Sequence, residues 1–402
     1  MRVLKVVLFS HDSVGLGHIR RNLALAHALS DSLPGLLGVH VSGLLVTGEA
    51  AATKFPAPAG WDWCVLPGIR KSSAGYRPRR LEMDMGNFTS LRSDLLTAVL
   101  LGFSPDLFVV DRHPTGVHGE LENALTALRT EVPNCRTVLG LREILDSPGA
   151  VAPEWTAVGG PGRIKELFDR IWIYGDPAIH NPFATGEVPG ELQGMADFTG
   201  YLAAGRAHVA GPPLLTGRYV MSMVGGGSDG RALAELAAQA EPPPGVGHLI
   251  VTGPQMTDED RTAVEARAGE RATVVQTVPD MISQIRHSKA VVSMGGYNSV
   301  CELMGTNVPA LIVPRSSVRA EQRLRAEGLA AAGLVEHCRQ RDLSPARLTE
   351  WFARNLDKRV LRGGLQLSGL RVAGELAAQL LDGSPPSARA YSAREVAESA
   401  AV

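Results

Sequence analysis

Two glycine-rich turns in the second half of the chain have residue types and surroundings that suit phosphate binding. Gly225–Gly230 (GGGSDG) and Ser293–Ser299 (SMGGYNS) each follow an apolar run and precede a helical pattern. A strand, a glycine turn and a helix start bring free backbone N–H groups and the positive end of a helix to one point. The first turn lacks the G-x-x-x-x-G-K-[ST] pattern, which disfavours a kinase or ATPase loop. We predict phosphate contacts at both turns, with a flexible connection as the alternative for the first.

Polar side chains beside the second turn could hold a ribose or a sugar. Glu302 falls one turn into the helix that this turn opens, from where a carboxylate can reach a ribose diol. Glu321 and Gln322 stand together at another helix start, and a carboxylate beside an amide can bind several hydroxyls. The alternative for each is a charged residue at a helix start, solvated or paired with the helix dipole. Taken alone, neither pattern decides between the two interpretations.

A histidine follows a third glycine turn, near the start of the chain. Gly15-Leu16-Gly17-His18 directly precedes a helical pattern, and an imidazole with an unperturbed pKa of about 6.5 suits a general base near neutrality. A histidine near a helix start is as often a structural or substrate-positioning group. We therefore keep His11, Asp12 and His113 as competing candidates for the base. We expect them on the side of the site that faces the acceptor, the molecule that would give up the proton.

The same side chains, taken with Asp111, have the residue types of a metal site. They show neither the C-x-x-C nor the H-E-x-x-H spacing that makes a metal site convincing. We predict no metal ligands and no cofactor. Arg142 ends a strand in a cluster of charges, and because strand ends line ligand crevices in open sheets, we expect it on the acceptor side.

The elements that must position these residues alternate in the first half of the chain. Short β-branched runs alternate with helical periodicity, which favours βα units and a parallel sheet. Strands are expected at residues 3–9, 39–46, 61–66, 107–110, 137–141 and 171–174, and helices at 19–30, 91–101 and 119–129. The basic stretch Arg70–Arg80 is predicted to be turn-rich, either drawing an anionic acceptor group or forming a solvated loop.

The second half repeats this rhythm after an Ala/Gly/Pro-rich stretch at 203–217. Strands are expected at 219–224, 248–251, 273–276, 290–293 and 310–313, and helices from 229 and at 258–268, 281–287, 298–304 and 321–332. The predicted domains are 1–202, then an exposed linker at 203–217, then 218–360. A C-terminal helix at 361–382 is expected to pack back on the first domain, and 383–402 is expected to be mobile. The predicted fold class is α/β, with two doubly wound Rossmann-like domains.

Composition restricts the class of protein. The 402 residues carry 40 basic and 41 acidic side chains, a net charge of −1, so there is no global field to attract nucleic acid. Cys64, Cys135, Cys301 and Cys338 are far apart, as expected of reduced thiols in a cytoplasmic protein. We find neither a signal sequence nor an apolar run long enough to cross a membrane. Peripheral membrane contact is not indicated, and the oligomeric state cannot be inferred.

The run from Thr273 to Gly333 resembles the donor half of family 28 glycosyltransferases, notably the N-acetylglucosaminyltransferase of peptidoglycan synthesis. The shared features are Asp280-Met281, the Gly-Gly-x-Asn-Ser-x-x-Glu turn, Val308-Pro309, Pro314 and Glu321-Gln322. The resemblance is weaker before Ala203. There the Gly-Leu-Gly-His turn, with His11-Asp12 before it and Arg20-Arg21 after it, resembles an uncharacterised bacterial group of predicted glycosyltransferases.

This resemblance implies the GT-B architecture, two domains facing a cleft, and a role for each matching residue. Glu302 would bind the donor ribose, Glu321 and Gln322 the donor sugar, and backbone groups of Thr277 and Val278 the base. The diphosphate contacts would be Gly225, Gly226, Gly227, Ser228, Gly295, Gly296, Asn298 and Ser299. Asp111 stands where related inverting transferases place the aspartate that pairs with the catalytic histidine, so His18 and Asp111 are the implied catalytic pair.

The expected activity is transfer of a sugar from a nucleotide-diphosphate donor, usually UDP in this family, to an unknown small or lipid-linked acceptor. The reaction would be inverting and metal-independent. A hydrolysing UDP-N-acetylglucosamine 2-epimerase shares this architecture, but would need several carboxylates arranged for elimination. A non-catalytic nucleotide-sugar-binding subunit is the other alternative, although the polar residues His18, Asp111 and Arg142 are retained here.

Overall fold

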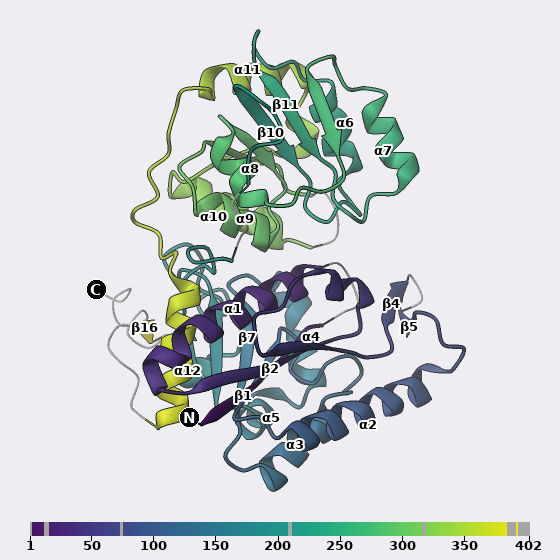
Figure 1. Ribbon diagram of the computed structural model, residues 1–402, viewed down its shortest axis with the longest axis vertical. Helices are drawn as coiled ribbons and strands as arrows, with labels where there is room; N and C mark the ends of the chain where they lie inside the picture. Colours follow the sequence, from purple (N-terminus) through teal and green to yellow (C-terminus); the bar gives the residue numbers. More distant parts are fainter. Residues whose placement is uncertain are drawn as a thin grey trace. The chain divides into compact units, whose positions relative to one another are not determined.

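The computed structural model describes residues 2–11, 16–72, 75–207, 211–315, 319–383 and 391–392. The chain divides into two compact units, the first formed by Met1–Arg206 with Ser368–Val402 and the second by Ala207–Leu367. Each unit has its own mainly parallel sheet flanked by helices (Figure 1). The two units are described separately.

The sheet of the first unit has the strand order β16-β9-β8-β7-β6-β1-β2-β3. Neighbouring strands are parallel, except that β16 is antiparallel to β9. The strands are β1 Val3–Phe9, β2 His40–Thr47, β3 Trp61–Val65, β6 Leu107–Asp111, β7 Arg136–Arg142, β8 Arg170–Tyr174, β9 Ala196–Phe198 and β16 Tyr391–Ser392. The six strands predicted here are confirmed. The central strands β6, β7 and β8 are buried almost throughout, which is why they show as continuous apolar runs in the sequence.

Helices of the first unit pack in pairs. They are α1 Gly17–Leu37, α2 Met85–Phe103, α3 Glu122–Glu131, α4 Pro148–Ala157, α5 Gly160–Leu167 and α12 Gly369–Asp382, with 3-10 turns η1 Ala50–Lys54 and η2 Gly190–Met195. α1 packs against α12, and α2 against α3. α1 presents Ile19, Leu25, Leu29 and Leu33 to the interior at helical spacing. This packing fixes the start of α1 at the carboxyl end of β1.

The C-terminal helix is shorter than its sequence pattern predicts. The prediction spans 361–382, but α12 begins at Gly369. The side chain of Arg362 accounts for the difference, because its guanidinium donates hydrogen bonds to the carbonyls of Thr306 and Val308 in the second unit. Residues 361–367 therefore belong to the second unit, whereas α12 belongs to the first.

The stretch 203–217, predicted as an exposed connection, contains the boundary between the two units, and most of its described residues are exposed. Residues up to Arg206 belong to the first unit. Beyond the undescribed residues 208–210, the stretch is bonded to α8: the Ser283 hydroxyl donates to the Gly211 carbonyl. Further hydrogen bonds join Gln284 to this stretch. Most of the tail predicted to be mobile, from 383 on, lies outside the described residues, although β16 pairs with β9.

The basic stretch Arg70–Arg80 forms a hairpin, which corrects its interpretation as a loop. β4 Ile69–Ser72 pairs antiparallel with β5 Gly75–Pro78. Ile69 is buried in a small cluster with Phe88 of α2, and Arg79 bonds the Glu49 carboxylate. These contacts order a segment whose charge alone suggested a solvated turn.

The sheet of the second unit has the order β12-β11-β10-β13-β14-β15, and all its pairs are parallel. Its strands are β10 Tyr219–Met223, β11 Gly247–Val251, β12 Ala272–Val275, β13 Val291–Ser293, β14 Ala310–Ile312 and β15 Glu336–His337. Counted from β10, this is the 3-2-1-4-5-6 order of a doubly wound dinucleotide-binding sheet. The five strands predicted for this half are confirmed, and the two-residue β15 was not predicted.

Helices of the second unit are α6 Arg231–Ala238, α7 Asp258–Glu265, α8 Met281–His287, α9 Tyr297–Met304, α10 Glu321–Ala331 and α11 Pro345–Asn355, with a 3-10 turn η3 Gln340–Asp342. The first five agree with the prediction. α11 was missed, although Ser344 caps its first turn and Leu348, Trp351 and Phe352 enter the core.

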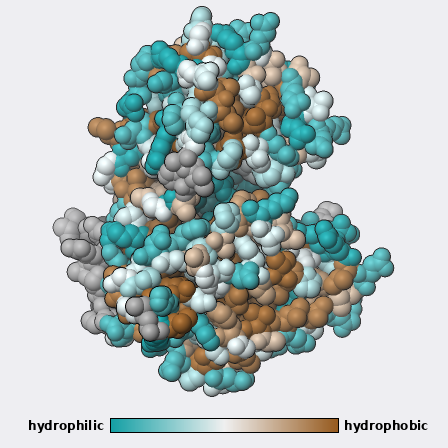
Figure 2. Space-filling model, viewed as in Figure 1, coloured by the Kyte–Doolittle hydropathy of each residue, from teal (hydrophilic) through white to brown (hydrophobic). Residues whose placement is uncertain are grey.

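The described part of the chain contains no helix long and apolar enough to cross a membrane. On the face drawn in Figure 2, both units expose hydrophilic as well as hydrophobic residues.

Candidate functional site

Both units place their candidate residues where the strand order reverses. In the second unit β10 lies between β11 and β13, so the glycine turns after β10 and β13 flank this point. In the first unit β1 lies between β2 and β6, so the segments after β1 and β6 do the same. Ligands of open α/β sheets bind outside the carboxyl ends of the strands at such switch points. The predicted phosphate turns and the predicted catalytic pair therefore occupy equivalent places in two separate sheets.

The first turn of the second unit requires glycine at particular positions. Gly225 and Gly227 have φ angles of +65° and +96°, which residues with a Cβ rarely adopt. A Cβ on Gly227 would lie 2.3 Å from the carbonyl oxygen of Thr252. The turn is therefore held by a close backbone approach, and its exposed residues Gly225, Gly226 and Ser228 leave it accessible.

The second turn lies next to the first. A Cβ built on Gly225 would be 3.9 Å from the Ser299 hydroxyl. Helix α10 supports this turn from behind, because Arg325 donates to the Gly295 carbonyl at 2.8 Å and the Gln322 backbone packs against Gly295. The eight predicted phosphate contacts are divided equally between the two turns: Gly225, Gly226, Gly227 and Ser228 in the first, and Gly295, Gly296, Asn298 and Ser299 in the second.

The side chains predicted to bind ribose and sugar are mostly buried. Glu302, Glu321 and Gln322 are 4%, 4% and 7% exposed. The Gln322 amide oxygen accepts the backbone N–H of Arg315 at 3.1 Å. The Arg315 guanidinium contacts the Asp229 carboxylate at 3.1 Å and the Glu321 carboxylate at 3.6 Å. Arg315 thus joins the end of the first turn to the predicted sugar-binding pair, a link that sequence reasoning missed.

Thr277 and Val278, the predicted base contacts, follow β12 at the edge of the same sheet. Thr277 is exposed and Val278 half-buried. The N–H of Gly253 donates to the Gln276 carbonyl at 2.9 Å, so this segment is tied to the loop after β11. In the sheet, β11 separates β12 from β10, so this segment is two strands away from the glycine turn that follows β10.

His18 and Asp111 meet in the first unit. The His18 Nδ1 atom is 2.7 Å from Asp111 Oδ2, with side-chain exposures of 15% and 0%. His18 lies in the first turn of α1, and Asp111 is the last residue of β6, which pairs with β1. The pair predicted from the resemblance is thus brought into hydrogen-bond contact, across 93 residues of sequence.

Arg21 completes this cluster from the same helix. Its Nε and one terminal nitrogen bond Asp111 Oδ1 at 3.1 and 2.8 Å, and the same terminal nitrogen lies 2.6 Å from Oδ2. The Arg21 side chain is 2% exposed. The sequence analysis named Arg21 only as a neighbour of the turn, but its position three residues after His18 puts both on one helix face.

The charges of this cluster determine where the imidazole proton lies. Burial opposes ionisation of Asp111, but Arg21 and His18 outweigh it and hold the pKa of that carboxyl well below its ordinary value. An ionised carboxylate only accepts hydrogen bonds, so Nδ1 of a neutral His18 carries the proton and Nε2 keeps its lone pair. Burial lowers the pKa of His18, and Arg21 and Arg142 oppose the raising effect of Asp111. The lowered pKa favours the neutral form of the imidazole near pH 7.

Two further predicted residues adjoin His18. The ring of His11 lies 5.5 Å from that of His18 and 4.2 Å from that of His113, and the Tyr76 ring of the hairpin is 6.3 Å from His11. Burial, followed by the nearby His18, lowers the pKa of His11 well below its ordinary value. Asp12, also predicted here, lies outside the described residues.

Arg142 ends β7, the strand beside β6. It is half-buried, and its charge is one of those that lower the pKa of His18, so the structure brings this predicted residue to the same region. Within the described ranges, no group of three or more His, Cys, Asp or Glu side chains has the arrangement of a metal site.

The C-terminal unit matches a known family. Residues 221–359 match the model of the Glycosyltransferase family 28 C-terminal domain, a span that includes both glycine turns and Glu302, Glu321 and Gln322. This part of the second unit is therefore similar to the C-terminal domain of family 28 glycosyltransferases. A curated relative, the UDP-N-acetylglucosamine–N-acetylmuramyl-(pentapeptide) pyrophosphoryl-undecaprenol N-acetylglucosamine transferase of Brucella suis, is 32% identical over 105 residues. That alignment covers 25% of this chain and only 28% of the relative.

Solved glycosyltransferase structures share the fold of the matched domain and of the rest of the chain. MurG of Acinetobacter baumannii aligns with 98% of both chains at 12% identity and a TM-score of 0.52. The glycosyltransferase VinC, solved with dTDP, aligns with 96% of both at 16% identity and a TM-score of 0.54. At these identities the likeness concerns the fold alone. The predicted fold class, GT-B with two Rossmann-like domains, is confirmed.

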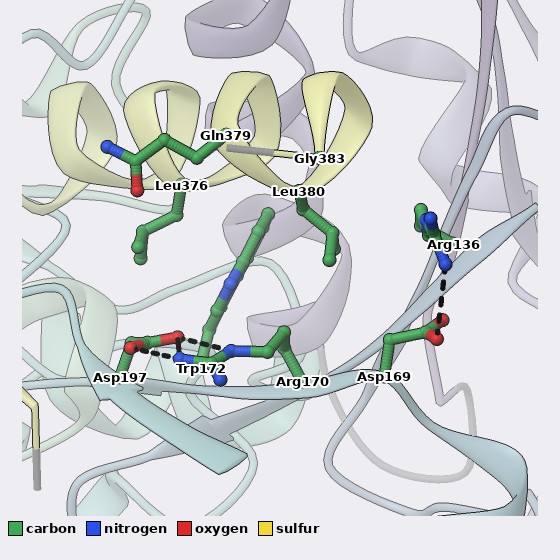
Figure 3. A pocket seen from close by; sticks show the side chains of 9 residues that line it. All are labelled: Arg136, Asp169, Arg170, Trp172, Asp197, Leu376, Gln379, Leu380 and Gly383. Carbon is green, nitrogen blue, oxygen red and sulfur yellow. Dashed lines mark hydrogen bonds and ion pairs between the residues drawn. The ribbon is translucent and has the colours of Figure 1, made fainter. Parts of the chain in front are cut away.

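A hollow in the first unit is lined by neither His18 nor Asp111, the predicted catalytic pair, and lies outside the matched residues 221–359. This cavity of about 330 Å³ is lined by Leu376 and Leu380 of α12 and by charged residues at the starts of β7 and β8 (Figure 3). Its charges are paired, because Arg170 bonds Asp197 and Asp169 contacts Arg136. It opens at the amino ends of strands whose carboxyl ends face His18, so we assign it no part in the candidate site.

Proposed function

We propose that the protein transfers a sugar from a nucleoside-diphosphate donor to a hydroxyl or amine of a small or lipid-linked acceptor. UDP is the first candidate for the nucleotide, with inversion at the anomeric carbon and without a metal. The observation that carries this proposal is the meeting of two glycine turns at the switch point of the domain similar to family 28, beside Glu302, Glu321 and Gln322.

The donor would be bound mainly by backbone. Diphosphate oxygens would accept hydrogen bonds from N–H groups of the two turns at the starts of α6 and α9, where the helix dipoles favour negative charge. Glu302 would accept hydrogen bonds from the ribose diol, and Glu321 with Gln322 from the sugar hydroxyls. The curated relative is named for UDP-N-acetylglucosamine, and VinC was solved with dTDP. Backbone groups at Thr277 and Val278 would contact the base.

The chemical step would use the cluster of the first unit. His18 Nε2 takes the proton of the acceptor O–H as that oxygen attacks the anomeric carbon, while the bond from this carbon to the diphosphate oxygen breaks. The diphosphate leaves with the bonding electron pair, stabilised by helix ends and N–H groups. Asp111 keeps the Nδ1 proton in place and stabilises the imidazolium that forms. His11, His113 and Arg142 are proposed to face the acceptor.

Calorimetry with UDP, dTDP, GDP and ADP tests the donor proposal. One nucleotide, with UDP expected, should bind at micromolar concentration, and Glu302→Ala should weaken binding of UDP about tenfold through loss of a charge-assisted hydrogen bond. Uridine 5′-diphosphate made with 2′,3′-dideoxyribose is the matched probe, because Glu302→Ala should not affect its binding. If none of the four binds more tightly than millimolar, the diphosphate proposal fails.

A screen of nucleotide-sugars for slow hydrolysis without acceptor tests the reaction. His18→Ala should preserve donor binding and reduce turnover by about a hundredfold or more, and excess EDTA should change neither. Conversion of UDP-N-acetylglucosamine into its manno epimer would instead establish the epimerase alternative. Donor binding with no hydrolysis or transfer, in a broad acceptor panel, would favour the non-catalytic subunit.

A further inference from the structure

Arg21 is neither the proposed base nor its direct aspartate partner, yet it holds the carboxylate on which that pair depends. It bonds both oxygens of Asp111, and the Oδ2 atom of that carboxylate also meets His18 Nδ1. All three side chains come from two neighbouring elements, the first turns of α1 and the end of β6. One carboxylate is thus shared between a permanent cation and an imidazole.

A histidine beside an ionised aspartate is ordinarily pushed toward its imidazolium form. An imidazolium has no lone pair and cannot act as a base, so with the dyad alone a smaller fraction of His18 would be in the neutral form that can accept a proton near neutral pH. Arg21 carries a compensating positive charge, and its terminal nitrogen lies 3.1 Å from His18 Nδ1. The Asp111 charge that would stabilise the imidazolium is thereby neutralised, while its oxygen still orients the ring.

Arg142 of β7 acts in the same direction as Arg21, because its positive charge also lowers the pKa of His18. The buried ring of His11, from the end of β1, stands edge-on to His18 and, with its own pKa lowered by burial, adds no charge. Asp111 opposes the two arginines, because its charge and its hydrogen bond raise the pKa of His18. The pKa of His18 is nevertheless lowered, with burial as the main cause.

We propose that Arg21 is a positioning residue that keeps His18 neutral and correctly oriented by binding Asp111 from the opposite side. This role rests on the proposed function, in which His18 is the base. The proposal goes beyond the histidine–aspartate pair, because it makes a third residue responsible for the protonation and orientation of His18. Arg21 itself does not touch the reacting atoms.

The titration of His18 in the whole protein tests this role without any substrate. Proton–nitrogen NMR of the imidazole, assigned by the signal that His18→Gln removes, should give a wild-type pKa below 6.5, the ordinary value. Arg21→Met should raise this pKa by about 1 or more, as expected when an opposing charge beside the pair is lost. Arg21→Lys keeps the positive charge but not the two-nitrogen contact of the guanidinium with Asp111. In this variant the pKa of His18 should stay close to its lowered wild-type value.

The pH dependence of turnover is the second readout. If turnover requires neutral His18, the acidic limb of the kcat/KM profile, which reports the free enzyme, should move to higher pH in Arg21→Met by the same amount as the NMR pKa. At a pH below that limb, the rate falls about tenfold for each pH unit by which the limb moves upward. Arg21→Lys should return the limb toward its wild-type position, while kcat on the plateau stays reduced because the bidentate contact is lost.

Arg92→Met is the control for loss of a buried arginine. Arg92 and Glu120 form an ion pair in the same unit with both side chains fully buried, so this variant should lose stability to a similar extent. It should leave the His18 pKa and the acidic limb unchanged. A wild-type His18 pKa above 6.5, or an unchanged pKa in a folded Arg21→Met, would overturn the proposal. Should Arg21→Met not fold, the wild-type and Arg21→Lys titrations still decide it.

The outcomes also separate this proposal from the proposed function. The expected Arg21 effect on the His18 pKa with no effect on the kcat/KM profile would show that His18 is not the base, which contradicts both the proposed mechanism and the role given to Arg21. Failure to bind any nucleotide would contradict the donor proposal while leaving the titration result intact.

Discussion

The switch point of the second unit is built from backbone, whereas that of the first is built from side chains. In the second unit, Gly227 and Gly295 pack against carbonyl groups, and the space that a Cβ would take is already filled. In the first unit, His18 and Arg21 converge on the buried carboxylate of Asp111. Both sheets reverse their strand order, but one places closely packed backbone turns at the reversal and the other places a cluster of charged and polar side chains there.

The difference follows from what each site is proposed to do. A diphosphate needs many weak donors in fixed positions, and backbone N–H groups at helix starts provide them without a buried charge. Proton transfer needs one group with a tuned pKa, which only neighbouring charges and burial can provide. The backbone site should therefore be sensitive to added atoms, and the side-chain site to removed charges.

Removal of the shared carboxylate should have the largest effect. Asp111→Ala leaves Arg21 buried without its partner, which should lower the free energy of unfolding by about 3–5 kcal/mol, and turnover should fall by about a hundredfold or more. Denaturant unfolding and initial rates measure the two effects. Asp229→Ala, which removes a more exposed partner of Arg315, should change the free energy of unfolding by about 1 kcal/mol or less. Equal losses in both variants would contradict the contrast drawn between the units.

Addition of a single methyl group to the first glycine turn should come next. Gly227→Ala forces a Cβ to within 2.3 Å of the Thr252 carbonyl oxygen, at a φ of +96°. The turn must shift, so UDP binding should weaken by about tenfold or more, since several N–H contacts depend on its shape. Calorimetry with UDP measures this change.

Gly245→Ala separates strain from displacement. Gly245 also has a positive φ, of +76°, but a Cβ there would meet no atom within 4 Å. This variant should lose about 1 kcal/mol of stability from strain alone and bind UDP as the wild type does. Similar losses of UDP binding in the two variants would mean that Gly227 acts only through stability.

The sequence predicted the second unit better than the first for a physical reason. Its glycine turns are local: the strand, turn and helix start that define each one are consecutive in the chain. The positions of Glu302, Glu321 and Gln322 at or near helix starts follow from the same run of sequence. In the first unit Arg21 and Asp111 are 90 residues apart, and nothing near Arg21 in the sequence indicates which carboxylate it binds.

The missed elements have equally specific causes. The hairpin of β4 and β5 was taken for a loop because its many basic residues masked Ile69, the residue that anchors it. The start of α12 was placed too early because a helical pattern does not reveal that Arg362 binds carbonyls of the second unit. Arg315 was given no role, since its partners Asp229 and Glu321 come from other segments.

The smallest effect is expected for Arg315, a charged side chain beside glycine turns that would otherwise bind the donor through backbone groups. Arg315 is a cation beside the predicted diphosphate site, where it offsets the negative charges of Asp229 and Glu321 next to a negative ligand. Arg315→Ala should weaken binding of UDP by a few-fold to about tenfold, through loss of one charge-assisted interaction, and leave uridine binding unchanged. Calorimetry at two salt concentrations should show a weaker salt dependence in the variant.

Arg323→Ala is the matched control, because Arg323 lies nearby in the sequence, on α10, and pairs with Glu327 at the surface. It should bind UDP and uridine as the wild type does. Tighter UDP binding by Arg315→Ala would mean that Arg315 only bridges the two carboxylates and competes with the ligand. The donor site would then depend on backbone alone, and the contrast between the two units would be complete rather than partial.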